Sequence, residues 1–218
     1  MTGQLITVAL IAKTPVPGRV KTRLCPPCEP DEAAAVATQL LDHAVALIAS
    51  VVDDSVTPAV LLDGEPGDWI PDGWRVVPQR GDGLDERLAN GFDDIGGPAI
   101  IMAMDSPEVM TCDLTSIVAA LAEHDAVLGP TSDGGYWCIG LAAPNQRAVV
   151  GVPMSQPDTL YHQKIRLELL GLRYATTNTF DDIDTFQDAL RVAERIPKTS
   201  IANCINTIAE RHRLHAQN

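Results

Sequence analysis

The sequence is poor in aromatic residues and in cations. Phe, Trp and Tyr make up 4% of its 218 residues, and 16 Lys and Arg stand against 29 Asp and Glu, which gives a formal charge of -13. General nucleic-acid binders gain affinity by neutralising many phosphates over a broad surface. The charge balance therefore argues against a general nucleic-acid binder and favours one small ligand.

Several features that define other protein classes are missing. No internal repeat or low-complexity tract is visible, the N-terminus has no basic region followed by an apolar core, and no apolar stretch approaches the ~20 residues that span a bilayer. Neither the Gly-Lys-Ser/Thr end of a Walker loop nor a three-glycine dinucleotide fingerprint occurs. With 45% hydrophobic content, we expect a cytoplasmic protein that forms a single domain over residues 1–218.

The five cysteines, an odd number, do not suggest a disulfide framework. Only Cys25 and Cys28 form a C-x-x-C pair, and Pro26 and Pro27 fill its centre. A structural zinc site needs a second pair of ligands, and a redox C-x-x-C normally opens a helix. We expect these cysteines to be reduced and structural.

The few cations gather in residues 12–24 (AKTPVPGRVKTRL), here called the cationic loop. The loop contains no acid and holds a quarter of all Lys and Arg: Lys13, Arg19, Lys21 and Arg23. It follows an apolar run (LITVALIA) typical of a buried parallel strand, and open α/β sheets bind ligands beyond the carboxyl ends of such strands. Pro15, Pro17 and Gly18 stop both strand and helix. We favour a site for a small phosphorylated ligand over a solvated basic loop.

Three aspartates have the positions expected of ligands to a hard cation. Asp105 directly follows the apolar segment AIIMAM, and Asp182 and Asp184 alternate about Ile183, so that both carboxylates point the same way in an extended chain. Carboxylates plus substrate phosphates are the usual ligands of Mg²⁺. Capping of the following helix is the alternative for Asp182 and Asp184, and we expect one to cap and at least one to bind Mg²⁺ or Mn²⁺.

Two glycine-rich segments are candidates for the rest of a ligand site. In residues 79–84 (QRGDGL), Gln79 offers a donor and an acceptor to a base edge, and the glycines allow close approach of a flat ligand. In the turn Asp133-Gly134-Gly135, the aspartate can accept hydrogen bonds from the hydroxyls of a sugar or another acceptor. Ordinary turns explain the glycines equally well.

The remaining pattern alternates strands with helices, as in an α/β protein. The expected helices are 31–51, 84–95, one from near 111 to 121, 159–170, 186–196 and 201–215. The expected strands are 5–12, 57–62, 74–77, 99–104, 126–129, 136–141 and 173–177, with 136–141 as an antiparallel return in an otherwise parallel sheet.

Taken together, AKTPVPGRVKTRL, QRGDGL..RL (residues 79–88), MDSP, SDGGYWCIGL and DIDT resemble segments of a bacterial family of GT-A-like nucleotide-diphospho-sugar transferases, over residues 5–196. The resemblance implies a Rossmann-like three-layer α/β/α sandwich with a mostly parallel sheet and an antiparallel strand. It also implies metal-dependent transfer from a nucleotide-activated donor. Guanylyltransferases of deazaflavin cofactor biosynthesis are related and carry a similar basic loop.

By this resemblance each candidate residue receives a role. The nucleotide-binding set is Ala12, Lys13, Gly18, Arg19, Lys21, Arg23, Gln79, Gly81, Asp82 and Gly83. Asp105, Asp182 and Asp184 are expected to hold Mg²⁺ or Mn²⁺, Asp133, Gly134 and Gly135 to bind the acceptor, and Lys21, Asp105 and Asp133 to be catalytic. The expected partners are a nucleotide or nucleotide-sugar donor and a small-molecule acceptor, with no nucleic acid and no membrane span. A homodimer is a further possibility.

Three functions follow, of which glycosyl transfer ranks narrowly first. A nucleotidyltransferase, guanylyltransferase-like, would condense a nucleoside triphosphate with a small phosphorylated acceptor and release pyrophosphate, and the four cations of the loop suit a triphosphate. A non-catalytic nucleotide-binding subunit is the third alternative. The aligned acids argue against that subunit, because binding alone does not need them.

Overall fold

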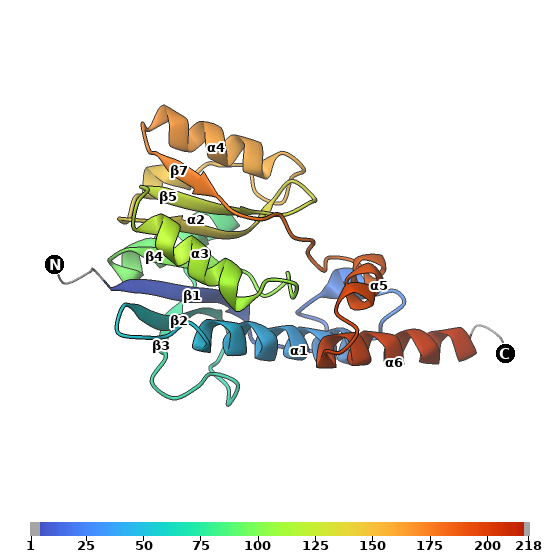
Figure 1. The fold of residues 1–218 in the computed structure, drawn as a ribbon. Helices are drawn as coiled ribbons and strands as arrows, with labels where there is room; N and C mark the ends of the chain where they lie inside the picture. Colours follow the sequence, from blue (N-terminus) through green and yellow to red (C-terminus); the bar gives the residue numbers. More distant parts are fainter. Residues whose placement is uncertain (1–4, 216–218) are drawn as a thin grey trace.

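One mixed sheet organises the protein in a computed structural model that describes residues 5–215 (Figure 1). Within that range the strand order is β3-β2-β1-β4-β6-β5-β7. The strands are β1 (Ile6–Lys13), β2 (Val56–Asp63), β3 (Arg75–Pro78), β4 (Ala99–Met102), β5 (Ala126–Pro130), β6 (Tyr136–Leu141) and β7 (Tyr174–Thr176). Only β6 runs antiparallel to its neighbours, β4 and β5. The prediction of a mostly parallel sheet with an antiparallel return at residues 136–141 is confirmed.

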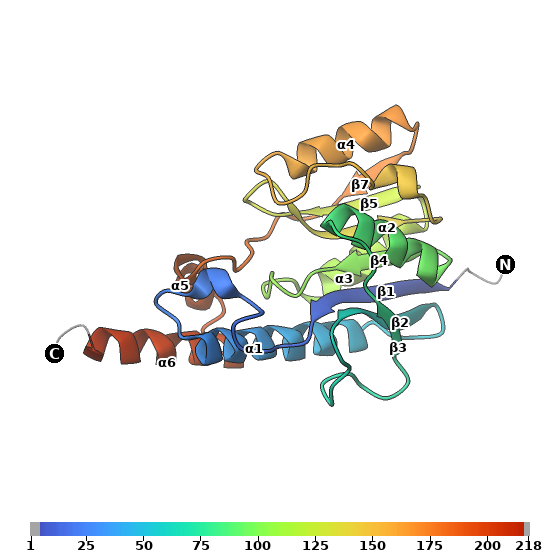
Figure 2. The same cartoon turned by 180° about the vertical axis from the view of Figure 1, so that it is seen from behind.

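Helices cover both faces of the sheet, which explains why the central strands are apolar on both sides. One face packs against α1 (Pro30–Ala49) and α3 (Thr111–Leu121), and the other against α2 (Leu84–Ile95) and α4 (Thr159–Leu169). Figure 2 shows the α2 side. Along β1, Val8 and Leu10 point to the first face and Ala9 to the second. The result is the expected three-layer α/β/α sandwich.

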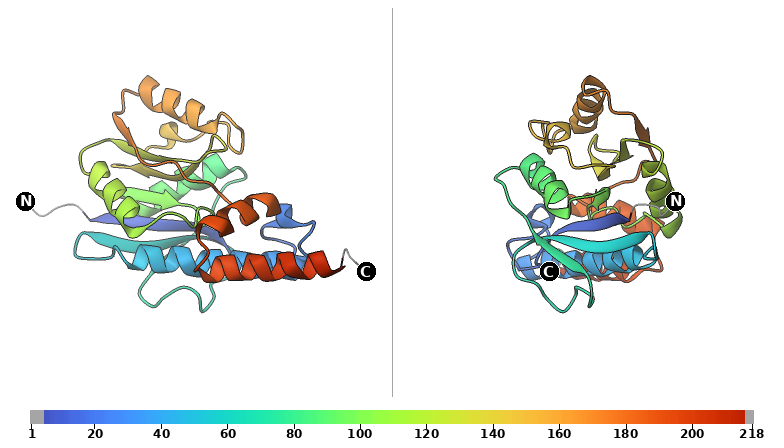
Figure 3. Two further views of the ribbon diagram at one scale, coloured as in Figure 1. Left: turned by 45° about the vertical axis from the view of Figure 1, so that its right-hand side comes forward. Right: turned by 90° about the vertical axis from the view of Figure 1, so that its left-hand side faces the viewer.

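A third apolar cluster joins α5 (Phe186–Arg195) and α6 (Ser200–His215) to the first half of α1. Figure 3 shows α6 lying alongside α1. Two fully buried residues, Leu24 from the cationic loop and Ile183 from the acidic segment, are part of this cluster. The helical packing therefore fixes the positions of both segments that were predicted to bind ligand.

Most predicted elements exist with boundaries shifted by one or two residues. The helix predicted at 84–95 matches α2, whereas the strand predicted at 99–104 is shorter and ends at Met102. The helix predicted from 31 begins at Pro30, because Glu29 is its N-cap and proline is well tolerated at the first helical position.

The expectation that no apolar stretch approaches a membrane-spanning length needs correction. By length and composition alone, the 20-residue helix α1 is apolar enough to cross a bilayer. Because 61% of its apolar window is buried inside the protein, α1 has the character of a core helix.

Candidate functional site

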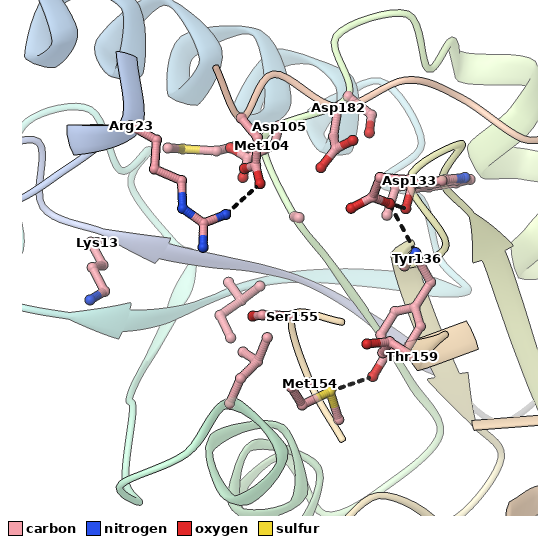
Figure 4. A pocket seen from close by; sticks show the side chains of 18 of the residues that line it. Lys13, Arg23, Met104, Asp105, Asp133, Tyr136, Met154, Ser155, Thr159 and Asp182 are labelled. Carbon is pink, nitrogen blue, oxygen red and sulfur yellow. Dashed lines mark hydrogen bonds and ion pairs between the residues drawn. The ribbon is translucent and has the colours of Figure 1, made fainter. Parts of the chain in front are cut away.

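A cleft of about 850 Å³ lies at the carboxyl ends of the parallel strands. Residues of the cationic loop line it, together with residues that follow β3, β4 and β5 and residues of the segments 154–159 and 182–184. Carboxyl ends of parallel strands share one edge of a sheet, so segments far apart in sequence converge there. Figure 4 shows Arg23, Asp105, Asp133 and Asp182 facing a common space.

Two cations of the loop reach across the cleft to the predicted metal ligands. The Lys21 ammonium nitrogen lies 2.8 Å from Asp105 Oδ1 and donates a hydrogen bond to the Ile183 carbonyl, and its side chain is only 7% exposed. Arg23 Nη1 donates to Asp184 Oδ2 at 2.8 Å. The cationic loop and the late acidic segment thus lie in the same cleft and are tied together by charge.

The other cations line the same space but make different contacts. Lys13 Nζ lies 3.4 Å from Asp63 Oδ2, and Arg87 Nη1 lies 3.2 Å from the same oxygen. Arg19 has no ion-pair partner within residues 5–215. Arg87 belongs to the QRGDGL..RL segment, but the sequence assigned it no role. It lies in the first turn of α2, which begins at Leu84.

Of the three predicted metal ligands, Asp182 is the one without an ion-pair partner among the described residues. Burial, followed by the negative charges of Asp133, Asp184 and Asp105, raises the pKa of Asp182 to about 6. A neighbouring cation would favour the charged carboxylate and reverse this shift. The electrostatics around Asp182 therefore favour the arrival of positive charge.

The donor chemistry fits a hard divalent cation, although no site is assembled. Among residues 5–215, no group of three or more His, Cys, Asp or Glu side chains is placed to hold a metal ion. Lys21 and Arg23 already neutralise two of the predicted ligands, Asp105 and Asp184. Asp105 Oδ1 is also buried without an aligned hydrogen-bond donor, so its contact with Lys21 is an ion pair only. Carboxylate oxygens remain suitable ligands for Mg²⁺ or Mn²⁺.

The hypothesis that Asp182 or Asp184 caps the next helix is wrong. The N-cap of α5 is Thr185, whose hydroxyl accepts from the Asp188 backbone N–H, while the Asp188 carboxylate accepts from the Thr185 backbone N–H. This reciprocal arrangement is a capping box. Neither Asp182 nor Asp184 is needed for it, so both carboxylates are free of that structural role.

Ser106 is a cleft-lining residue that sequence reasoning missed. The residue is 6% exposed, and its hydroxyl has no hydrogen-bond partner among the described residues. Buried polar groups are nearly always paired, so an unpaired hydroxyl beside Asp105 requires an explanation. The available signal was its place in the MDSP segment, directly after the predicted metal ligand.

Gln79 differs from its prediction. Its Nε2 donates to the carbonyl oxygens of Ala12 and Leu61 at 2.8 and 2.9 Å, and its Oε1 accepts from Arg87. An amide nitrogen has only two hydrogens, so this structure leaves none for a base edge. The side chain instead ties the ends of β1 and β2 together, so the backbone of residues 79–83 and the exposed side chain of Asp82 are left for a base.

The backbone of the turn after β5 packs directly against the backbone of Pro157. Gly134 has a φ of +92°, and a Cβ there would lie 1.8 Å from the Pro157 carbonyl oxygen. Asp133 Oδ1 accepts from the Thr131 hydroxyl at 2.5 Å and from the Gly135 N–H at 2.9 Å. These contacts explain the glycines by turn geometry and fix the Asp133 carboxylate in the cleft wall, with Oδ2 available to a ligand.

Comparison with protein families identifies the chain. The model described as "Uncharacterized protein conserved in bacteria (DUF2064)" matches residues 33–156, more than half of the sequence. The chain belongs to the DUF2064 family. The matched range includes Gln79, Asp105 and Asp133, but the cationic loop precedes it and Asp182 and Asp184 follow it. Among curated proteins, none matches this DUF2064 chain significantly.

Solved structures share the fold of this DUF2064 protein. A protein of Desulfovibrio desulfuricans G20, provisionally named a nucleotide-diphospho-sugar transferase, has 20% identity and a TM-score of 0.82 over 94% of this chain and 95% of its own. CMP:2-keto-3-deoxy-manno-octonic acid synthetase, complexed with CTP, has 11% identity and a TM-score of 0.57 over 89% and 99%. Glucosyl-3-phosphoglycerate synthase of Mycobacterium tuberculosis, complexed with Mn²⁺, UDP and glucosyl-3-phosphoglycerate, has 14% identity and a TM-score of 0.51 over 83% and 72%.

Proposed function

We propose that this DUF2064 protein is a divalent-metal-dependent transferase that uses a nucleotide-activated donor, and that it is a glycosyltransferase built as a single domain. The observation that carries the proposal is the charge balance of the cleft. Five cations and five aspartates line it, so their formal charges cancel. A nucleoside diphosphate brings further negative charge that these side chains do not neutralise. A divalent cation bound with the donor would complete the balance.

Each side chain has a role in this proposal. Asp105, Asp182 and Asp184 would hold Mg²⁺ or Mn²⁺, which supplies charge stabilisation at the phosphate oxygens of the leaving nucleoside diphosphate. Lys13, Arg19, Lys21 and Arg23 would bind the phosphates, with Arg87 added to the set. The backbone at Gly81 to Gly83 would contact the base. These residues bind and orient the donor.

The acceptor would bind at the turn after β5. Asp133 would accept a hydrogen bond from the attacking hydroxyl through Oδ2, since Oδ1 is already engaged by Thr131 and Gly135. A carboxylate in that position orients a hydroxyl and can take its proton. Gly135 lines the cleft beside Asp133, whereas Gly134 serves the turn itself, because its Cα faces the Pro157 carbonyl. The catalytic set of the proposal is therefore Lys21, Asp105 and Asp133.

Nucleotidyl transfer is the second candidate, and the number of cations favours it. Four cations in one loop exceed what a metal-bridged diphosphate needs, and a synthetase complexed with CTP shares the fold. Glycosyl transfer still ranks first, because the solved structure that matches this chain with a TM-score of 0.82 is provisionally named a nucleotide-diphospho-sugar transferase.

The test is a product assay with Mg²⁺ or Mn²⁺, a panel of sugar nucleotides and nucleoside triphosphates, and candidate acceptors. Release of a nucleoside diphosphate supports glycosyl transfer. Pyrophosphate release would select nucleotidyl transfer instead. Tight nucleotide binding without either product would support a non-catalytic subunit, and absence of nucleotide binding in every condition would overturn the whole proposal.

A further inference from the structure

The cations of the protein itself stand against the carboxylates that a metal ion would need. Lys21 is paired with Asp105 and Arg23 with Asp184, each at 2.8 Å. A divalent cation that approaches Asp105 meets an ammonium group at contact distance, and like charges at such a distance repel strongly. A metal ion at Asp105 therefore competes with the Lys21 ammonium for the same carboxylate.

Displacement of Lys21 is costly without a new partner. Its side chain is 7% exposed, and its other contact is the neutral carbonyl of Ile183. Its backbone adopts a left-handed conformation, φ 48° and ψ 35°, which non-glycine residues rarely occupy. A buried ammonium that loses its counter-charge pays a desolvation cost. A phosphate oxygen of the donor would replace that counter-charge.

The converse also holds. A phosphate that recruits Lys21 and Arg23 leaves Asp105 and Asp184 without their cations. Both carboxylates would then face Asp182 and Asp133, whose negative charges already act on one another. Four carboxylates in one space repel unless positive charge arrives. A divalent cation would supply it.

We propose that Lys21 and Arg23 form a resting-state latch on the acidic group, so that a divalent cation and an anionic donor bind with strong positive coupling. The proposal rests on the proposed function, because it concerns the same cleft. Each ligand removes the cost of binding the other, and thermodynamic linkage makes the effect reciprocal. The device would keep the site from holding a metal ion before the donor arrives.

The rival explanation is that Lys21 and Arg23 are structural ties between two loops. In that case the two ion pairs would stabilise the fold, and the ammonium of Lys21 would not compete with a metal ion for Asp105. The two explanations differ in the effect of removing the ammonium. A latch that is removed frees Asp105 and raises the affinity for the metal alone, whereas a lost tie loosens the site and lowers that affinity.

The first measurement is made on the wild-type protein. Mn²⁺ binding is titrated by electron paramagnetic resonance with and without inorganic pyrophosphate, a diphosphate without base or sugar, and a protein-free titration corrects for Mn²⁺ bound by pyrophosphate in solution. We expect pyrophosphate to raise Mn²⁺ affinity by roughly 5- to 150-fold, the usual range of coupling between sites. Independent binding of the two ligands would overturn the proposal.

The second measurement uses Lys21→Met, which removes the ammonium and keeps a long side chain. We expect this variant to bind Mn²⁺ alone about tenfold more tightly than wild type, and to lose most of the enhancement by pyrophosphate. Lys198→Met is the matched control, because Lys198 is exposed and outside the cleft but its replacement changes the net charge equally. Unchanged or weaker Mn²⁺ binding by Lys21→Met overturns the proposal.

Arg23→Met keeps the test valid if Lys21→Met does not fold. The Arg23 side chain is 69% exposed, so its loss should be tolerated, and we expect a smaller rise in Mn²⁺ affinity in the same direction. None of these readouts requires turnover. Failure of coupling with intact nucleotide binding would therefore remove the latch alone, whereas absence of nucleotide binding would remove the proposed function.

Discussion

The two walls of the cleft are built in different ways. On one side, the cationic loop extends long charged side chains, and Lys21 and Arg23 bind aspartates from segments more than 80 residues away. On the other side, the turn after β5 packs its own backbone against Pro157, with Gly134 at the contact. One wall depends on charge and the other on shape.

This difference determines how each wall responds to a ligand or to a substitution. Long side chains change partners by rotating bonds, so the cationic wall can exchange an aspartate for a phosphate. A backbone contact without a side chain has no such freedom, because any added atom must displace the chain. We expect substitutions in the first wall to change affinities and substitutions in the second to change stability.

Gly134→Ala should produce the largest effect on the free energy of unfolding. The added Cβ would lie 1.8 Å from the Pro157 oxygen, and alanine is disfavoured at a φ of +92°. Overpacking and the left-handed backbone together predict a loss of about 4 kcal/mol, measured by urea denaturation. Gly97→Ala is the control, since a Cβ there meets no atom within 4 Å. If the two variants had the same free energy of unfolding, the conclusion that this wall is rigid would be wrong.

Gln79→Leu should have the next largest effect and would separate structure from ligand binding. Loss of the amide leaves the carbonyl oxygens of Ala12 and Leu61 without their side-chain donor, at a cost of about 2 to 3 kcal/mol. The control is Gln156→Leu, which replaces an exposed glutamine of the same cleft and should leave the free energy of unfolding unchanged. If Gln79→Leu instead keeps full stability and loses nucleotide affinity, the original base-reading prediction is correct.

The sequence was sufficient to predict the sheet and the meeting of the cationic loop with the acids. Apolar runs mark buried strands, and parallel strands end at one edge, so Lys21 and Asp105 had to approach one another. Their direct ion pair could not be predicted. It depends on the reach of one side chain from a left-handed backbone position, which nothing in the neighbouring residues specifies.

Residues with two plausible roles were the ones that sequence reasoning misassigned. Gln79 offers the same amide to a base or to the backbone, and only the register of β1 and β2 decides between them. Thr185 and Asp184 are adjacent and both can cap a helix, so the backbone geometry decides. Ser106 and Arg87 received no role, although both stand in the quoted segments, because a serine beside a proline and an arginine on a helix are common in any sequence.

Asp182→Asn should stabilise the protein at neutral pH. The pKa of Asp182 is raised from 3.8 to about 6, so the folded state binds its proton more tightly than the unfolded state does. The charged carboxylate therefore destabilises the fold above about pH 6, and this cost disappears below about pH 4. We expect a gain of about 1 to 2 kcal/mol at pH 8 that vanishes at pH 4, measured by urea denaturation.

The matched control for Asp182 is Asp68→Asn, an exposed aspartate outside the cleft. It should show no gain at either pH, since surface substitutions without special contacts have small effects. A destabilised Asp182→Asn variant at pH 8 would mean that a cation already neutralises Asp182, and the charge pattern of the acidic wall would have to be revised.

Ser106→Ala should have the smallest effect on the fold and a measurable one on binding. Removing a buried hydroxyl that has no partner costs little, so the free energy of unfolding should change by less than about 1 kcal/mol. If the hydroxyl bonds a ligand, the affinity for pyrophosphate with Mn²⁺ should fall roughly 2- to 10-fold, as expected for one hydrogen bond. Ser116→Ala on α3 is the control for both readouts. If Ser106→Ala instead lowers the free energy of unfolding and leaves the affinity for pyrophosphate unchanged, Ser106 has a structural role. A hydroxyl that only binds ligand does not stabilise the ligand-free protein.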